Sequence, residues 1–531
     1  MQIEQKQSCD LLVLGSGIAG ITAALEGAEA GASVVLACKG KLFSGSSFYP
    51  GTWGLGLIGP ADEADREDLV RSIETVGCGM AQDDLVRTLV DGITPAIHKL
   101  EQMGVKLRKA QGGADQREYI PCFDHKHRAW NGIEFDSARE VFSRRLKELE
   151  VCILPGLEAL ELCRQDGRVC GAVLSDGKEL VYISCKALVL STGGYGSLFQ
   201  HHLCTGDVEG LGQALALDAG CRLVNMEFMQ IMPGYLRPAY QTIFNEKVFR
   251  FSRLEAEGRE LLSGAEGQAL LDKRSGHGPF TSRLESRAVD LAICGAGDGV
   301  TVRYTEELRQ NPPEFVKTYF DWLEQAKGLT MEDPIQIALF SHAANGGVWI
   351  GKDGSTGVPG LFAAGEVTGG MHGADRIGGL STANGLVFGG RAGRAGAAAA
   401  GTAPRPPEHW TVCMEGAEDC GERFRRLQAV MSRYAMAQRE GAGLDTALNE
   451  VQGLYDGMVL RPTEDTAQVQ ETRRLRGQLK TALVILSAER LRTESRGSHY
   501  RADYPTENPG MARRIWTRER DGGLVTAFEE D

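Results

Sequence analysis

Three glycines near the start of the chain have the spacing of a phosphate-binding turn. Gly15, Gly17 and Gly20 follow the apolar run 9–14 and precede the Ala-rich stretch 21–30. Gly15 permits a sharp turn, Gly17 lets the backbone approach a pyrophosphate, and Gly20 lets a helix pack against the preceding strand. The first backbone N–H groups of that helix would face the anion. These residues predict a dinucleotide site built on a β-α-β unit.

The second strand of this unit lacks a residue that such sites usually contain. The apolar run 32–37 ends in Cys38 and Lys39, where an acidic residue commonly binds the ribose hydroxyls. Ribose recognition is therefore expected from another part of the chain.

Length, charge and cysteine usage narrow the class of protein. A chain of 531 residues should form two or three domains, and a net charge of -13 argues against binding to nucleic acid or to an anionic membrane surface. No apolar stretch approaches the ~20 residues of a membrane span, and the start of the chain lacks a signal-peptide pattern, so a cytoplasmic location is expected. The 13 cysteines include no Cys-x-x-Cys pair. We therefore expect no metal, iron-sulfur cluster or haem, and any such centre would belong to another protein.

The apolar patterning predicts an α/β protein. Helical periodicity covers residues 66–103 and 136–149, and strands are expected at 151–154 and 169–174. A further buried strand, 186–191, ends in a double-glycine turn that could make a second backbone contact to a dinucleotide.

An insertion interrupts this pattern. From about residue 225 to residue 334 the sequence is irregular and rich in charges, which indicates an inserted domain. The dinucleotide pattern resumes at 357–366 and ends in an Ala/Gly-rich helix at 383–400. A short linker, 401–407, then leads to a charged helical segment.

Several segments in this order resemble the FAD flavoprotein family of fumarate reductase, succinate dehydrogenase and L-aspartate oxidase. The resemblance covers nearly the whole chain. It is carried by the glycine motif and by six further segments: Ser44–Tyr49, Ser191–Gly196, Met226–Gln230, Ser341–Val348, Ala364–Gly379 and Glu494–Pro505.

The resemblance implies an α/β fold with a Rossmann-like FAD-binding domain, an inserted α+β capping domain and a C-terminal helical domain. The FAD-binding domain would comprise residues 1–224 and 352–402, the capping domain 225–351 and the helical domain 408–531. Where covalent members attach FAD through a histidine, this chain has Ser46, so noncovalent FAD is expected. The resemblance assigns the following residues to the cofactor: Gly15, Gly17, Ile18, Ala19, Gly20, Lys39, Gly45, Ser46, Ser47, Thr192, Gly193, Gly194, Gly365, Glu366, Arg376 and Ser381.

The family moves hydride between the flavin and a carbon next to a carboxylate, while an acid or base handles the neighbouring proton. Arg376 matches the family's substrate-binding arginine, and its planar guanidinium suits a carboxylate. His342 matches a substrate-binding histidine. Arg283 is the candidate proton donor on the capping domain, but the residue after it is Leu284 instead of an acid. Arg287 is the alternative.

One departure bears on the substrate. After Gln230 the family has a histidine and then a threonine that bind a second carboxylate, whereas this chain has Met232, Pro233 and Gly234. An unpaired carboxylate in an apolar pocket is costly, so a substrate that is less polar at this end is expected.

Three functions remain open at this point. The first is reduction of a carbon-carbon double bond next to a carboxylate, or the reverse reaction. The others are amine oxidation like that of L-aspartate oxidase and an electron-relay flavoprotein subunit, with a partner protein or NADH as the electron donor. The basic loop 124–128 is interpreted either as a substrate or flavin contact or as a solvated loop, and Asp207 is given no role.

Overall fold

The computed structural model describes residues 1–52, 54–109, 123–124, 126, 128–297 and 299–530. Its centre is an eight-stranded sheet in which β6, β2, β1, β9, β8 and β7 are neighbours in that order, while β17 pairs with β9 and β19 pairs with β1. The strands β6, β2, β1, β9 and β17 run parallel. The strand bounds are β1 Gln2–Leu14, β2 Val34–Cys38, β6 Cys152–Pro155, β7 Glu158–Gln165, β8 Arg168–Ser175, β9 Leu180–Leu190, β17 Leu361–Ala363 and β19 His409–Thr411.

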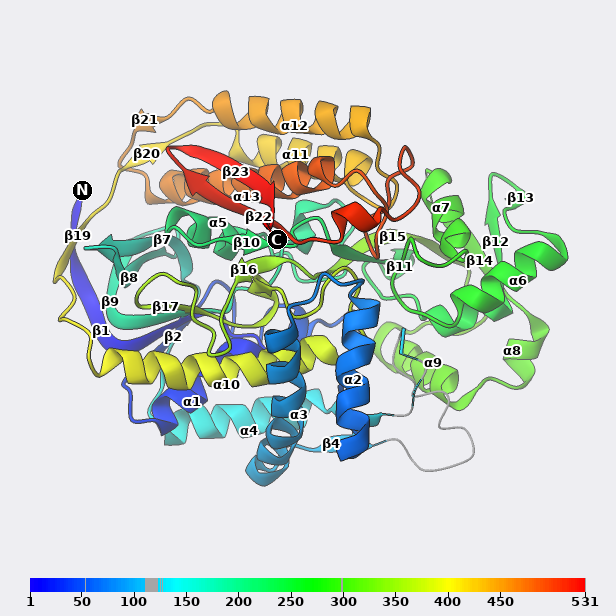
Figure 1. Cartoon of the computed structure of the whole chain (residues 1–531), viewed down its shortest axis with the longest axis horizontal. Coiled ribbons are helices and arrows are strands. Elements are labelled where there is room, and N and C mark those ends of the chain that lie inside the picture. Colours follow the sequence, from blue (N-terminus) through cyan, green and yellow to red (C-terminus); the bar gives the residue numbers. More distant parts are fainter. Residues whose placement is uncertain (53, 110–122, 125, 127, 298, 531) are drawn as a thin grey trace.

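The carboxyl halves of these parallel strands are continuous apolar runs because both faces of the sheet are covered. Helices α1 (Ile18–Glu29) and α10 (Leu380–Ala400) lie together on one side (Figure 1). A Cβ atom on Gly393 would lie 2.3 Å from the carbonyl oxygen of Ala23, so α10 can approach α1 this closely only with glycine there. The predicted strands at 151–154, 169–174 and 186–191 correspond to β6, β8 and β9.

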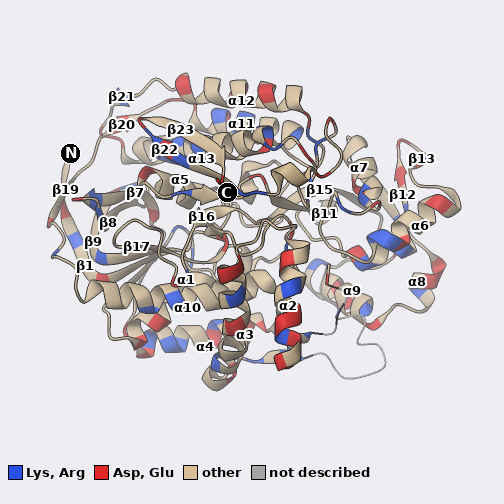
Figure 2. Cartoon of the chain, in the orientation of Figure 1, with Lys and Arg blue, Asp and Glu red and all other residues tan. Residues whose placement is uncertain are grey.

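Helices α2 (Glu63–Val76), α3 (Asp83–Met103) and α4 (Phe135–Glu148) confirm the predicted helical stretches. A small antiparallel sheet in the order β3-β5-β4 accompanies them; β3 (Leu55–Gly59) precedes α2, and β4 (Leu107–Lys109) and β5 (Ala129–Ile133) lie between α3 and α4 in sequence. Figure 2 shows acidic and basic residues along the outer helices, such as α2 and α6, whereas most of the ribbon of the central sheet is tan.

A second sheet lies within the region that interrupts the dinucleotide pattern. It is antiparallel in the order β11-β15-β14-β12-β13 and, with helices α6 to α9, forms the lobe on the right of Figure 1. The bounds are β11 Met229–Arg237, β12 Ser252–Ala256, β13 Arg259–Glu260, α6 Gly264–Arg274, α7 Arg287–Gly295, β14 Val300–Tyr304, α8 Glu306–Gln310, α9 Glu314–Lys327 and β15 Ile335–Ala344.

The C-terminal region consists of helices followed by a hairpin that the sequence did not predict. Helices α11 (Cys420–Tyr434), α12 (Gly441–Asp456) and α13 (Thr466–Leu491) form the upper layer of Figure 1. The hairpin of β22 (Ile515–Arg520) and β23 (Gly523–Phe528) joins a third sheet in the order β18-β16-β10-β22-β23. Its other members are β10 Leu223–Val224, β16 Gly347–Trp349 and β18 Thr368–Gly369.

Helix α5 (Leu211–Asp218) packs against α13. The two-stranded sheet β20-β21 (Glu415–Gly416 and Arg461–Pro462) also contacts α13 through β20. None of the helices that the structure describes has both the length and the apolar character that crossing a bilayer requires.

Candidate active site

The glycine turn has the geometry that its spacing predicts. Gly15 has a φ of +109°, and a Cβ atom there would lie 2.3 Å from the carbonyl oxygen of Ser191. A Cβ on Gly20 would lie 1.9 Å from the carbonyl oxygen of Gly15, so helix α1 packs directly on the turn. Gly17 caps α1 without a side-chain hydrogen bond, and the Ile18 N–H donates to the Ser47 hydroxyl at 3.2 Å. The turn therefore presents the N-terminus of α1 to an anion.

A long cavity runs from this turn to the second sheet. It is lined by most of the residues that were expected to bind the cofactor: Gly15, Gly17, Ile18, Ala19, Lys39, Gly45, Ser46, Ser47, Thr192, Gly193, Gly365, Glu366, Arg376 and Ser381. Gly20 and Gly194 lie behind the wall. A Cβ on Gly194 would lie 2.7 Å from Glu366 Oε1, so this glycine makes room for the Glu366 carboxylate.

Unpaired polar atoms on the wall fit a bound dinucleotide. Thr192 Oγ1 and Asp207 Oδ1 are buried and have no hydrogen-bond partner among the residues that the structure describes, and both residues line the cavity. A ligand rich in hydroxyl and phosphate groups would satisfy such atoms. Together with the open N-terminus of α1, they show that these residues suit FAD.

Two carboxylates pair with Lys39 at the end of β2, where the usual acid is missing. Lys39 Nζ lies 2.9 Å from Glu158 Oε1 and also pairs with Glu209, and all three residues line the cavity. Burial opposes ionisation of Glu158, but Arg474 and Lys39 outweigh it and hold the pKa of this carboxyl below its usual range. Sequence reasoning missed these acids because they come from β7 and from the segment before α5.

The other end of the cavity contains a cation and a neutral imidazole. Arg376 is buried, and its Nε donates to Gln230 Oε1 at 3.0 Å, while Gln230 Nε2 donates to the Arg376 carbonyl at 3.1 Å. Desolvation and the nearby charge of Arg376 lower the pKa of His342 to about 3. His342 Nδ1 is buried without a partner among the described residues. Both side chains line the cavity, so they can bind one carboxylate together.

The structure distinguishes the two candidate proton donors. Arg283 Nε donates to Asp375 Oδ2 at 3.1 Å, and Asp375 directly precedes Arg376. Arg287 instead donates to the Ser282 carbonyl at 3.0 Å and lies over the ring of Tyr500. Neither arginine lines the cavity, although Pro279 of the same loop does.

Asp375 belongs to a segment that carries the family resemblance, but sequence reasoning assigns it no role. Its Oδ2 atom also accepts a hydrogen bond from Thr281 Oγ1 at 2.7 Å. Burial raises the pKa of Asp375 to about 6, although the charge of Arg283 opposes this rise. Asp375 therefore connects the loop of Arg283 to the loop of Arg376.

The wall near Met232 is apolar. Met232 on β11 lies opposite Phe340 on β15, and both pack with Tyr49 and Leu203. The β11–β15 register shifts beside this cluster, since Ile231 pairs with Ser341 and Gln230 pairs with Ala343, so His342 is the extra residue of a bulge in β15. A Cβ on Gly234 would lie 2.9 Å from a ring carbon of Phe340 and 3.0 Å from a methyl group of Leu203. The space for a polar side chain at position 234 is therefore filled by apolar groups.

The basic loop 124–128 lies only partly within the described residues, because His125 and His127 fall outside them. Arg128 is buried, pairs with Asp124 at 2.6 Å and with Asp68 at 2.9 Å, and also contacts Asp65. Lys126 pairs with Asp68 at 2.7 Å. None of the described residues of this loop lines the cavity, so these charges anchor the loop to α2.

A dinucleotide turn, a cavity that ends in an arginine and a neutral histidine, and a second sheet that supplies part of the wall define a flavoprotein oxidoreductase site. Within the described part of the chain, no three His, Cys, Asp or Glu side chains are placed to hold a metal ion.

Comparisons with known proteins agree with this class. The family model described as "FAD binding domain" matches residues 10–382, and "Fumarate reductase flavoprotein C-term" matches residues 424–525. The chain therefore belongs to the FAD flavoprotein family of fumarate reductase, succinate dehydrogenase and L-aspartate oxidase, and it is an FAD-dependent oxidoreductase.

Two relatives and two structures illustrate the similarity. The chain is 28% identical to one subunit of a CoM/CoB fumarate reductase of Methanothermobacter marburgensis, covering 96% of each chain, and 30% identical to an L-aspartate oxidase of Halobacterium salinarum, covering 93% of this chain and 96% of the relative. The fold is similar to that in the Mycobacterium smegmatis Sdh1 complex, with a TM-score of 0.80 at 22% identity over 99% and 95% of the two chains. It is equally similar to that in the Escherichia coli quinol fumarate reductase, with a TM-score of 0.80 at 21% identity over 99% and 97%.

Proposed function

We propose that this enzyme moves hydride between noncovalently bound FAD and a small monocarboxylate whose other end is apolar. The observation that carries the proposal is the contrast between the two sides of one cavity end. Arg376 and His342 offer a cation and an imidazole, whereas Met232 lies in a cluster with Tyr49, Leu203 and Phe340. An unsaturated acid that carries an alkyl group in place of a second carboxylate fits this surface.

In this proposal Arg376 and His342 have different roles in substrate binding. Arg376 binds the carboxylate and polarises the adjacent bond, and the hydrogen bond from its Nε to Gln230 Oε1 helps to hold the guanidinium in place. His342 stays neutral, so it binds the carboxylate by hydrogen bonding without adding charge. FAD, when bound, supplies the centre that gives or accepts hydride.

We assign the role of proton donor to Arg283 rather than to Arg287. Arg283 is tied to Asp375, and Asp375 is the neighbour of the carboxylate-binding arginine in the chain. The guanidinium of Arg287 is directed toward the Ser282 carbonyl and Tyr500. A proton on Arg283 can therefore be exchanged through the Asp375 carboxylate, whereas the contacts of Arg287 within the described part of the chain, the Ser282 carbonyl and Tyr500, include no carboxylate.

Amine oxidation like that of L-aspartate oxidase is the second candidate. The L-aspartate oxidase relatives support it, since they match nearly the full length of the chain. The apolar cluster at Met232 counts against it, because an amino dicarboxylate still needs a partner for its distal carboxylate. An electron-relay role is less well supported because a relay would have no use for Arg376 and His342 in the cavity.

The electron donor is proposed as either a partner protein or NADH. The Methanothermobacter relative is named as one subunit of its fumarate reductase, and the Mycobacterium smegmatis structure is that of a complex. Both favour a partner protein.

An anaerobic titration tests the proposed chemistry. The purified holoenzyme is reduced, and crotonate or fumarate is added while the absorbance of oxidised flavin is followed. Crotonate is fumarate with a methyl group in place of one carboxylate, so the pair isolates the distal end. Return of the oxidised band with crotonate supports the proposal. Bleaching of the oxidised enzyme by aspartate would support amine oxidation, and no response to any of the three acids would support the relay.

A further inference from the structure

The C-terminal segment 492–501 meets both arginine-bearing loops through two adjacent residues. The Gly497 carbonyl accepts a hydrogen bond from the Ser282 N–H at 2.7 Å. The Ser498 N–H and hydroxyl both donate to the Ala374 carbonyl, at 3.1 and 2.9 Å. Ser282 directly precedes Arg283, and Ala374 lies two residues before Arg376. One dipeptide therefore holds the backbone beside both arginines.

The C-terminal segment packs tightly against the loop that precedes Arg376. Gly497 has a φ of +53°, and a Cβ atom there would lie 2.6 Å from Ala374 Cβ. On the other side, the Ala374 N–H donates to the Gly77 carbonyl at 3.0 Å. Asn345 Nδ2 reaches the Ala374 carbonyl at 3.4 Å. The backbone before Arg376 is thus held between the C-terminal segment and the loop at Gly77.

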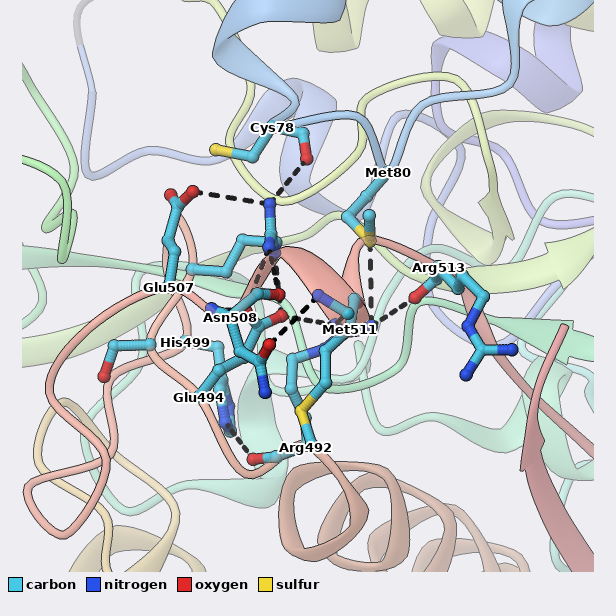
Figure 3. Close-up of polar contacts among 12 residues, drawn as sticks. Cys78, Met80, Arg492, Glu494, His499, Glu507, Asn508, Met511 and Arg513 are labelled. Carbon is cyan, nitrogen blue, oxygen red and sulfur yellow. Dashed lines mark hydrogen bonds and ion pairs between the residues drawn. The ribbon is translucent and has the colours of Figure 1, made fainter.

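A buried network of charges keeps the C-terminal segment in one conformation. Arg492 donates to Glu227 at 2.8 Å and to Glu494 at 2.7 Å, and Arg496 donates to Glu494 at 2.7 and 2.9 Å. Figure 3 shows Arg492 and Glu494 below Cys78 and Met80 of the neighbouring loop, with hydrogen bonds drawn between the two segments. Arg496 also donates to the Cys78 carbonyl at 3.1 Å. Buried ion pairs with this many hydrogen bonds tolerate little change in geometry.

A histidine ties this network to the helical layer. Arg439 donates to His499 Nδ1 at 2.7 Å, so the proton of the neutral ring is on Nε2, which donates to the Arg492 carbonyl at 3.2 Å. Burial and the charge of Arg439 lower the pKa of His499 well below its usual range, so the ring stays neutral. The segment is therefore fixed immediately before and after Gly497 and Ser498.

We propose that Gly497 and Ser498 form a positioning wedge that sets the distance between Arg283 and Arg376. In this account Ser498 is a positioning residue for the carboxylate site, since it acts through the Ala374 carbonyl rather than through the substrate. The part of this inference that concerns catalysis rests on the proposed roles of Arg283 and Arg376. The part that concerns backbone order does not depend on them.

Ser495 offers a matched control for Ser498. Both serines are buried in the same segment, and the Ser495 hydroxyl donates to the Tyr504 carbonyl at 2.7 Å and accepts from the Arg501 N–H at 2.9 Å. Both of these partners lie within residues 501–504, and neither belongs to the loops of Arg283 and Arg376. Ser495→Ala and Ser498→Ala should lower the melting temperature by similar amounts, and both should retain FAD.

Hydrogen exchange separates a positioning role from a purely structural one. Ser498→Ala should speed amide exchange in residues 373–376, whereas Ser495→Ala should leave these amides unchanged. With crotonate as the probe, Ser498→Ala should raise KM about fivefold, which corresponds to the net free energy of one hydrogen bond. Ser498→Thr keeps the hydroxyl and should return KM to the wild-type value. If Ser498→Ala does not fold, Ser498→Cys, which keeps a weak hydrogen-bond donor, should also speed amide exchange in residues 373–376 relative to Ser495→Ala, but by a smaller factor.

Equal changes in exchange for the two alanine variants, or no change at residues 373–376 in either, would overturn the wedge. The exchange measurement needs no substrate. If wild-type enzyme responds to neither crotonate nor fumarate, the proposed function fails while the exchange result still decides the wedge.

Discussion

The two halves of the long cavity recognise their ligands in different ways. The phosphate half uses the backbone of residues 15–20, where glycines permit close contacts, so the geometry of this turn is set by one short stretch of sequence. The substrate half is assembled from β11, β15, the loop before α10 and the loop before α7. A backbone site can be predicted from local spacing, whereas a side-chain site depends on how distant strands and loops are brought together.

This difference also separates what each half can change. A side chain at Gly20 would collide with the turn, so the phosphate half has little freedom to diverge. Met232 and Gly234 lie on a strand whose neighbours fill the space with apolar groups, so substrate preference can change there while the fold is kept. Substrate specificity is therefore expected to depend on the substrate half.

The largest effect is expected for Arg376→Ala. Removing the cation leaves a substrate carboxylate without its main partner, so kcat/KM with the active acid should fall by roughly 1,000-fold or more. The phosphate half should be unaffected, because it binds through other residues. Steady-state kinetics together with the flavin content of the purified variant check both statements, and loss of FAD along with activity would contradict the separation of the two halves.

The next largest effect is expected for Arg283→Gln, with Arg287→Gln as its control. Loss of the proton donor should lower kcat by about 100-fold with little change in KM. Arg287→Gln should keep kcat within about threefold, since this side chain donates to the Ser282 carbonyl rather than to Asp375. Full activity of Arg283→Gln with loss in Arg287→Gln would reverse our assignment.

A smaller effect is expected from pH. Burial raises the pKa of Asp375 to about 6, so this carboxyl loses its charge below that pH. Without the charge Arg283 lacks its ionic partner, and kcat should fall about tenfold as the pH drops through 6. Asp375→Asn should show no inflection there. An unchanged inflection in this variant would assign it to another group.

Stability should respond to the same group in the opposite direction. The ordinary pKa of an aspartate is 3.8, and the folded-state pKa of Asp375 is higher. Its contribution to the free energy of unfolding is therefore fully present below pH 3.8 and is lost as the pH rises through about 6. The difference in melting temperature between wild type and Asp375→Asn, measured across this range, isolates that contribution.

The sequence predicted the parts of the molecule that are local. The spacing of Gly15, Gly17 and Gly20 was sufficient for the turn, and apolar periodicity was sufficient for α2, α3 and α4. It could not supply the acids around Lys39 or the contact between Asp375 and Arg283, because these residues are far apart along the chain. The choice between Arg283 and Arg287 was open for the same reason.

The C-terminal hairpin shows the same limit. Strand β22 pairs with β10, almost 300 residues earlier, and no local pattern indicates such a pairing. Only the resemblance to the family singles out the segment 494–505 in the sequence. Its contacts with Ser282 and Ala374 join residues that are far apart along the chain, so they depend on the tertiary fold.

The central claim is that the distal end of the substrate site is apolar, and one measurement tests it most directly. The ratio of kcat/KM for crotonate over fumarate is determined for the wild type and for Met232→His. We predict a wild-type ratio of roughly 100 or more, because the second carboxylate of fumarate would be buried without a partner, and a drop of at least about tenfold in Met232→His. A wild-type ratio below one, with no change in the variant, would contradict the account.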